Sequence, residues 1–176
     1  MTIEIVAYNP DWIHIFEDEK ELLLTLFGSR VIIIEHIGST AIPHQHAKPI
    51  IDLFIGVSPF QELAFYSNVL NPKEYFYMAT GMTGRYLFQK YIDGIWTHNL
   101  HILSYDEEFY IRNEILFRDY LRTHPELVVQ YGELKRQLMV KYGLVEEYTR
   151  AKTGFIQTVI DSARKERGLP SQNVWE

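Results

Sequence analysis

Cysteine is absent from this chain of 176 residues. Its absence excludes disulfide bonds and thiolate metal sites, and it permits a reducing compartment. Long apolar runs are absent too: nowhere do about 18 apolar residues follow one another, as a membrane-spanning helix would require. The amino-terminal residues MTIEIVAYNPDW have neither the basic start nor the apolar centre of a signal peptide. We therefore predict a soluble, cytoplasmic protein without a membrane partner.

Positive charge is sparse, because 17 lysines and arginines stand against 23 aspartates and glutamates. The formal net charge of −6 argues against non-specific binding to nucleic acid or to an acidic membrane, since both depend on a basic field. Basic residues are nevertheless enriched in the carboxyl-terminal half of the chain, between Arg112 and Lys152. A local basic pocket there would suit a small phosphorylated molecule better than a polymer.

The most informative stretch begins with a predicted buried strand, Val31–Ile37, which is rich in β-branched residues. Gly38, Ser39 and Thr40 come directly after it, and such small residues let the backbone turn sharply. The amides of a turn of this kind, together with the two hydroxyls, form an anion site that suits phosphate. The sequence therefore predicts a phosphate-binding site at these three residues.

A second predicted strand, residues 50–57, is apolar on both faces except for Asp52. A carboxylate in a doubly buried strand is costly unless a cation, a metal ion or several hydrogen-bond donors accompany it. Asp52 is therefore the residue that most needs an explanation, either as a functional group or as one half of a buried ion pair.

The clearest local signal is a β-hairpin at residues 85–92 and 95–103. The two segments flank an Asp-Gly dipeptide, which is preferred in two-residue type I′ turns. The turn predicts a register in which Lys90 lies opposite Thr97. Because side chains alternate between the faces of a strand, Lys90 and His101 are then expected on the same face.

The chain as a whole predicts an α/β (α+β) fold with a mixed, largely antiparallel sheet. We expect an α/β core over residues 1–104 and a helical segment over residues 105–176 that packs on the core as one compact unit. The remaining predicted elements are an edge strand at 2–7, helices at 9–28 and 58–71, a strand at 74–79, and helices at 106–123, 125–143 and 145–167.

The run EHIGSTAIP at residues 35–43, followed by AKPIIDL at 47–53, resembles the signature of the GrpB family. Further matches span nearly the whole chain, including HNLH at 98–101, Tyr131 with Lys135, and Tyr148 with Lys152. That family is similar in fold to the nucleotidyltransferase superfamily. The resemblance therefore implies a sheet of the nucleotidyltransferase type.

The resemblance also implies roles for single residues. In nucleotidyltransferases a Gly-Ser turn holds the triphosphate and carboxylates on adjacent strands hold magnesium. Gly38 and Ser39 match the turn, and Asp52 matches one carboxylate. The next acid of the superfamily pattern is replaced by Phe54, and the remaining acid corresponds to His101. We predict that Asp52 and His101 are catalytic and bind Mg²⁺ or Mn²⁺, of which Mn²⁺ accepts nitrogen more readily. The alternatives for His101 are a general base or a hydrogen-bonded core histidine.

Four basic residues are predicted to neutralise the charge of a bound phosphate: Lys48, Lys90, Arg118 and Lys152. The alternative for Lys90 is a buried ion pair with Asp52, and the alternative for Arg118 is a pair with an acid four residues earlier. Lys48 is alternatively solvated, and Lys152 alternatively extends along an apolar helix face.

These observations predict a protein that binds a nucleotide or a similar phosphorylated small molecule, with metal-dependent transfer of a nucleotidyl group to an unknown acceptor as its activity. The alternative is a non-catalytic nucleotide-binding or accessory module, which Phe54 favours. Because some family members are fused to dephospho-coenzyme A kinase, the resemblance associates such a module with coenzyme A metabolism. A further alternative is a structural domain in which Asp52 and the basic residues pair only with each other.

Overall fold

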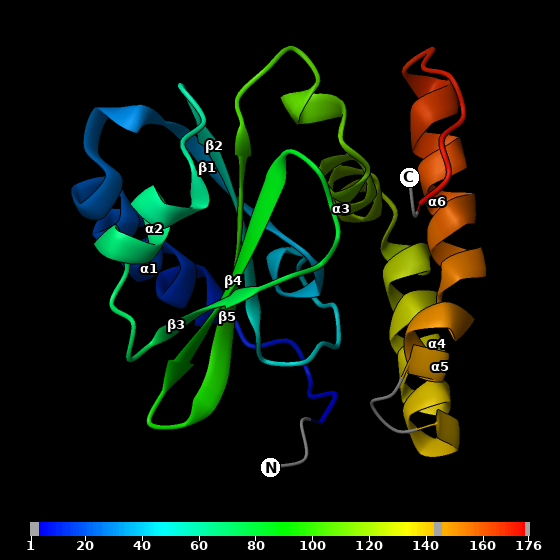
Figure 1. The fold of residues 1–176 in the computed structure, drawn as a ribbon. Coiled ribbons are helices and arrows are strands. Elements are labelled where there is room, and N and C mark those ends of the chain that lie inside the picture. The colour runs from blue at the N-terminus through cyan, green and yellow to red at the C-terminus, as the bar shows by residue number, and fades with distance from the viewer. Residues whose placement is uncertain (1–3, 143–145, 175–176) are drawn as a thin grey trace.

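The computed structural model describes residues 4–142 and 146–174, which place a central sheet between two layers of helices (Figure 1). Helices α1 and α2 lie on one side of the sheet, and α3, α4 and α6 lie on the other. The elements follow in the order α1 (Trp12–Phe27), η1 (Gly28–Arg30), β1 (Val31–Ile37), η2 (Ser39–Ala41), β2 (Ile51–Val57), α2 (Leu63–Val69), β3 (Tyr75–Met78), β4 (Arg85–Ile92), β5 (Ile95–Ser104), η3 (Phe109–Ile111), α3 (Asn113–Thr123), α4 (Pro125–Tyr142), α5 (Glu146–Ala151) and α6 (Thr153–Glu166).

The five strands are arranged in the order β1-β2-β5-β4-β3. Strands β2 and β5 run parallel to each other, whereas the pairs β1–β2, β5–β4 and β4–β3 are antiparallel. The parallel pairing requires a crossover between β2 and β5, and α2 with the β3–β4 hairpin provides it. The predicted fold class, a mixed and largely antiparallel sheet with helices, is confirmed.

The main core lies between the sheet and α1. Alternate residues of β2 and β5, such as Leu53, Ile55, Leu100 and Ile102, are fully buried on this face. Helix α1 covers them with a stripe of large apolar side chains at helical spacing, which is why this segment folds as an amphipathic helix. The stripe consists of Trp12, Phe16, Leu23 and Phe27.

The opposite face of the sheet carries the polar positions Asp52 and Asn99, which are paired in the β2–β5 register. Further along the same strands this face becomes apolar and packs on η3 and α3. A separate cluster joins α3, α4 and α6 around Ile42, in the loop that follows β1. The carboxyl-terminal helices are thereby held over the end of the sheet where Asp52 lies.

The predicted hairpin register is wrong beyond the turn. Lys90 pairs with His98 rather than with Thr97. A bulge beside Lys90 places one extra residue in β5, and a shift of one residue exchanges the two faces of a strand. Lys90 therefore lies on the face opposite to that of His101.

Several predicted helices have different bounds in the structure. The helix expected at 58–71 is confined to α2, because Glu62 before it and Leu70 after it have extended backbone conformations. The helix expected at 106–123 begins only with α3, after the turn η3. The helix expected at 145–167 is divided at Lys152 into α5 and α6, and residue 145 lies outside the described residues. Within residues 4–7, the expected edge strand is reduced to a single bridge between Val6 and Ala47.

None of the helices within the described ranges combines the length and the apolar composition that crossing a membrane requires.

Candidate functional site

A pocket of about 190 Å³ lies where the polar face of β2 and β5 meets the turn after β1 and the carboxyl-terminal helices. Strand β2 contributes one carboxylate, and the helices contribute lysines and tyrosines. The lining residues are Ile5, Ser39, Thr40, Lys48, Ile50, Asp52, Trp96, Asn99, Tyr131, Lys135, Tyr148 and Lys152.

Asp52 is held in a fixed position at the floor of this pocket. Asn99 Nδ2 donates a hydrogen bond to its Oδ1 at 2.8 Å, and Trp96 Nε1 donates to the side-chain Oδ1 of Asn99 at 3.2 Å. The Oδ2 atom lies against Gly38, where an added Cβ would come within 2.4 Å of it. Burial raises the pKa of Asp52 to about 6, although the hydrogen bond from Asn99 and the charge of Lys48 act in the opposite direction.

Lys135 enters the pocket from α4 and is 3% exposed. Its Nζ donates to Ser39 Oγ at 3.0 Å and to the main-chain carbonyl of His46, and it lies 4.5 Å from the centre of the Tyr131 ring. Both hydrogen-bond acceptors are neutral. Burial, together with the charges of two other lysines, lowers the pKa of Lys135 well below its usual range.

Those two lysines are Lys48, from the loop before β2, and Lys152, from the junction of α5 and α6. Their Nζ atoms lie 5.1 Å and 4.5 Å from the ring centre of Tyr148. Burial and the charge of Lys48 lower the pKa of Lys152 to about 8, while Asp52 partly opposes the shift. Burial likewise lowers the pKa of Lys48. The lining thus presents three amino groups and one carboxylate.

The turn after β1 presents one hydroxyl to the pocket and uses the other internally. Gly38 has a φ of 72°, a conformation that glycine adopts without strain, and residues 39–41 form a single 3-10 turn. Thr40 is buried, and its hydroxyl bonds His36 Nε2 at 2.9 Å and the Ile50 carbonyl at 3.3 Å. Ser39 is partly exposed and is contacted by Lys135. Ser39 therefore provides the partly exposed hydroxyl of this turn at the pocket.

The GrpB protein family model matches residues 2–162. The chain belongs to the GrpB family. It is 36% identical over 165 residues to UPF0157 protein YqkA of Bacillus subtilis, covering 93% of this chain but 48% of that protein. It is 33% identical over 163 residues to glutamate-rich protein GrpB of Alkalihalophilus pseudofirmus, covering 89% of this chain and 93% of the relative. The chain thus spans about half the length of YqkA and nearly all of the second relative.

Solved structures show the same fold. The crystal structure of conserved protein GrpB from Enterococcus faecalis superimposes with a TM-score of 0.85 at 31% identity, over 94% of this chain and 99% of that chain. Terminal uridylyl transferase 4 of Trypanosoma brucei, solved with bound GTP, gives a TM-score of 0.53 at 18% identity over 88% of this chain and 51% of that one. This more distant similarity shows a nucleotidyltransferase-like fold and nothing about chemistry.

In this GrpB-family chain, the predicted site residues fall into two groups. The structure brings most of them together around the pocket, either as lining residues or, for Gly38, against the Asp52 carboxylate. This group consists of Gly38, Ser39, Thr40, Lys48, Asp52 and Lys152.

Lys90 is placed elsewhere, beneath α1 on the other face of the sheet. It forms a buried ion pair with Glu19 at 2.5 Å, and Glu19 also accepts a hydrogen bond from the Tyr75 hydroxyl at 2.7 Å. Its partner is therefore Glu19, and the alternative that paired it with Asp52 is wrong. The displacement of Lys90 follows directly from the bulge in the hairpin.

Arg118 and His101 also lie outside the described pocket lining. Arg118 forms ion pairs with Glu35 at 2.6 Å and with Asp119 at 2.8 Å, and it donates to the His36 carbonyl. The alternative that paired it with an acid four residues earlier is wrong, because that acid binds Arg85 instead.

His101 is half-buried with its ring edge-on to Phe54, at 5.6 Å between ring centres. Its Nδ1 has no hydrogen-bond partner among the described residues. Burial, assisted by the charge of Arg85, lowers the pKa of His101 to about 4. The alternative of a hydrogen-bonded core histidine is therefore not met at Nδ1 among the described residues, and the catalytic role of His101 stays a prediction.

The donor set of the pocket does not fit a divalent metal ion. Among the described lining residues, Asp52 provides the single carboxylate and three lysines accompany it, whereas such ions take several oxygen ligands. Nowhere within residues 4–142 and 146–174 do three or more histidine or acidic side chains gather closely enough to hold a metal ion. The predicted Mg²⁺ or Mn²⁺ ligands Asp52 and His101 therefore do not form a metal site by themselves.

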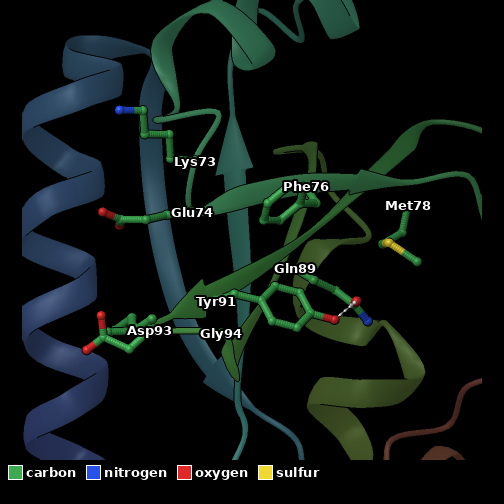
Figure 2. A pocket seen from close by; sticks show the side chains of 9 residues that line it. Lys73, Glu74, Phe76, Met78, Gln89, Tyr91, Asp93 and Gly94 are labelled. Atoms are coloured by element: carbon green, nitrogen blue, oxygen red, sulfur yellow. Dashed lines mark hydrogen bonds between the residues drawn. The ribbon is translucent and has the colours of Figure 1, made fainter.

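A larger surface groove of about 850 Å³ runs along β3, β4 and the hairpin turn (Figure 2). Figure 2 shows Tyr91 and Gln89 in its centre, bonded to each other at 3.0 Å, with Met78 at one end and Lys73 and Glu74 at the other. Its central polar groups are thus already paired and do not converge on a common point. The smaller lysine-lined pocket is the better candidate site.

Sequence reasoning missed several lining residues, of which Lys135 is the most important. Tyr131 and Lys135 are four residues apart on α4, as Tyr148 and Lys152 are across the α5–α6 junction. The spacing that places Lys152 beside Tyr148 therefore also places Lys135 beside Tyr131. The position of Trp96 had no such signal, because it depends on the bulge in β5.

Proposed function

We propose that this GrpB-family protein binds a nucleotide or another phosphorylated small molecule in the lysine-lined pocket. The observation that carries the proposal is the convergence of Lys48, Lys135 and Lys152 on a small cavity whose described lining has one carboxylate. Buried ammonium groups without matching acids are costly, and a bound polyanion would repay that cost.

The pocket's hydrogen-bonding groups support the same ligand class. Ser39 Oγ and the Asn99 amide can each donate to phosphate oxygens, and lysines provide compact point charges that suit such anions. A volume of about 190 Å³ is below the roughly 300–1,000 Å³ of pockets that enclose a whole drug-sized ligand. The phosphates are therefore expected inside, with the rest of the ligand towards the open side.

Nucleotidyl transfer is the activity that we propose for the pocket if its ligand is a nucleoside triphosphate. The structurally similar uridylyl transferase was solved with GTP, which supports testing this ligand class here. Phe54, buried where the superfamily pattern has an acid, instead favours the alternative of an accessory module that binds without transfer. Pyrophosphate release from a bound triphosphate distinguishes the two.

Thermal unfolding with a ligand panel tests the proposal. The panel contains nucleoside triphosphates and monophosphates, coenzyme A precursors and inorganic pyrophosphate, each with and without Mg²⁺ or Mn²⁺. A ligand at about one hundred times its Kd stabilises the folded protein by about 2.7 kcal/mol, which is readily measured.

Two lysine variants give the test its specificity. Lys48→Met removes a charge that lines the pocket, and it should weaken a ligand found in the panel by about 10- to 100-fold, the effect of losing a charged hydrogen bond of about 1.5–3 kcal/mol. Lys20→Met removes an equal charge from α1, where the partly exposed Lys20 pairs with Glu17 away from the pocket lining, and should leave the affinity unchanged. If no phosphorylated compound stabilises the wild type, or if both variants weaken binding equally, the proposal fails.

A further inference from the structure

Ser39 and Lys135 have the geometry of a nucleophile and its base. Lys135 Nζ lies 3.0 Å from Ser39 Oγ, within the distance over which a proton passes directly between two atoms. The serine is partly exposed to the pocket, whereas the lysine is 3% exposed. One atom can therefore meet a ligand while the other is shielded from water.

The amino group of Lys135 is held in place by two further contacts. It donates to the main-chain carbonyl of His46, and it lies over the ring of Tyr131 at 4.5 Å. A third group that orients the base is a recurring feature of side-chain pairs that activate a hydroxyl. The lowered pKa of Lys135, caused by burial and by Lys48 and Lys152, makes its neutral form more accessible than that of an exposed lysine.

The neighbouring residue gives an internal contrast. Thr40 also carries a hydroxyl in this turn, but it is buried and already bonded to His36 and to the Ile50 carbonyl. Ser39 is partly exposed instead, and its hydroxyl contacts the Lys135 amine and the Tyr131 side chain. Of the two hydroxyls, Ser39 is the one placed for a reaction.

We propose that Ser39 is a nucleophile that takes a phosphoryl group from a phosphate ester or anhydride, with Lys135 as its general base. This inference rests on the proposed binding of a phosphorylated ligand. Ser39 Oγ forms a bond to phosphorus and the bond from phosphorus to the leaving oxygen breaks. The hydroxyl proton passes to neutral Lys135 Nζ and then to the leaving oxygen, so the products are phosphorylated Ser39 and the free alcohol or shorter phosphate.

Lys48 and Lys152 complete the arrangement. Attack on a phosphate brings an oxygen nucleophile against negative charge, so neutralisation of the phosphoryl oxygens is required. These two lysines line the same cavity and carry no part of the proposed proton transfer.

The test is covalent labelling of the full chain by a reactive, uncharged alkyl fluorophosphonate, followed by mass spectrometry of its peptides. This reagent phosphonylates an activated serine without needing the cationic pocket, so labelling is independent of whether the ligand panel gives a hit. We expect a single adduct on Ser39, formed at least about 100-fold faster than on the exposed Ser29, as general-base catalysis would provide.

Three variants decide the role of the lysine. Lys135→Arg keeps a positive charge but cannot accept the proton, and Lys135→Met keeps the length without charge; both should slow labelling by about 100-fold. Arg136→Met, at the adjacent exposed position where Arg136 pairs with Glu133, should label at the wild-type rate. Unfolding curves identify which variants are folded, and at least one folded Lys135 variant is required for the comparison.

Absence of an adduct on Ser39 in the folded wild type overturns the proposal, even if the ligand panel succeeds. Equal labelling of Ser39 in wild type and in a folded Lys135 variant also overturns it, because the hydrogen bond is then only structural. Labelling that depends on Lys135 in a protein that binds no phosphorylated ligand supports the nucleophile and refutes the phosphoryl substrate class.

Discussion

Replacing Asp52 with asparagine should make the protein more stable at neutral pH. The asparagine oxygen can still accept the hydrogen bond from Asn99, so the local structure is expected to persist. What is lost is the charge, and burial makes that charge unfavourable in the folded state. The effect of Asp52→Asn on stability therefore shows whether the Asp52 carboxylate stabilises the fold or is kept for function at a cost in stability.

The size of the effect follows from the pKa of the carboxyl group. Burial raises the pKa of Asp52 from 3.8 to about 6 on folding. Between these values the folded state binds more protons than the unfolded state, so the free energy of unfolding falls as the pH rises. The loss from this group is about 1 kcal/mol at about pH 4.5 and reaches about 3 kcal/mol at about pH 7.5, at 1.36 kcal/mol per pKa unit.

Urea unfolding of wild type and Asp52→Asn at these two pH values measures the effect directly. The variant should exceed the wild type by about 3 kcal/mol at the higher pH and by about 1 kcal/mol at the lower, because contributions of the other carboxylates cancel. Asp18→Asn, on the exposed surface of α1, should show little change at either pH. An Asp52→Asn protein that is less stable than wild type at about pH 7.5 would refute the reasoning and would favour a structural ion pair.

Two further predictions concern groups on opposite faces of the sheet. Lys90→Met should lower the free energy of unfolding by about 3–5 kcal/mol in urea titrations, because it leaves the Glu19 carboxylate buried without its cation. Its ligand affinity, measured by calorimetry, should be the same as that of the wild type. Gly38→Ala should destabilise the chain by about 1–3 kcal/mol and disrupt ligand binding. The residue has a φ of 72°, and an added Cβ would collide with the Asp52 carboxylate. Normal stability and affinity of this variant would show that the turn does not need glycine.

Sequence patterns predicted the parts of the fold that depend on local chemistry. The two apolar central strands, the Asp-Gly turn and the start of α4 at Pro125 all have short-range causes, and each is present in the structure. The face on which Lys90 lies has no such cause. It depends on one extra residue in β5, and a bulge leaves no reliable mark in the residues that form it.

The pocket itself was predictable only in part, because some of its residues depend on tertiary packing and not on local sequence. Its turn and its carboxylate lie within 15 residues of each other in one continuous motif, so sequence alone identified them. The lysines of α4 and of the α5–α6 junction reach the pocket through tertiary packing around Ile42. Spacing along a helix shows that Tyr131 and Lys135 share a face, but not what that face covers.

The electrostatics of the pocket are consistent with an anionic ligand, because the described acids around it do not balance its lysines. Burial disfavours the charged forms of Asp52, Lys135 and Lys152, and the lysines are also raised in energy by one another. A purely structural cluster would be expected to match each cation with an acid, as Lys90 is matched with Glu19 on the other face. The pocket instead leaves positive charge in excess. A phosphate bound there would gain interactions with groups that the fold already holds in place, so that ordering these groups would cost the binding reaction little free energy.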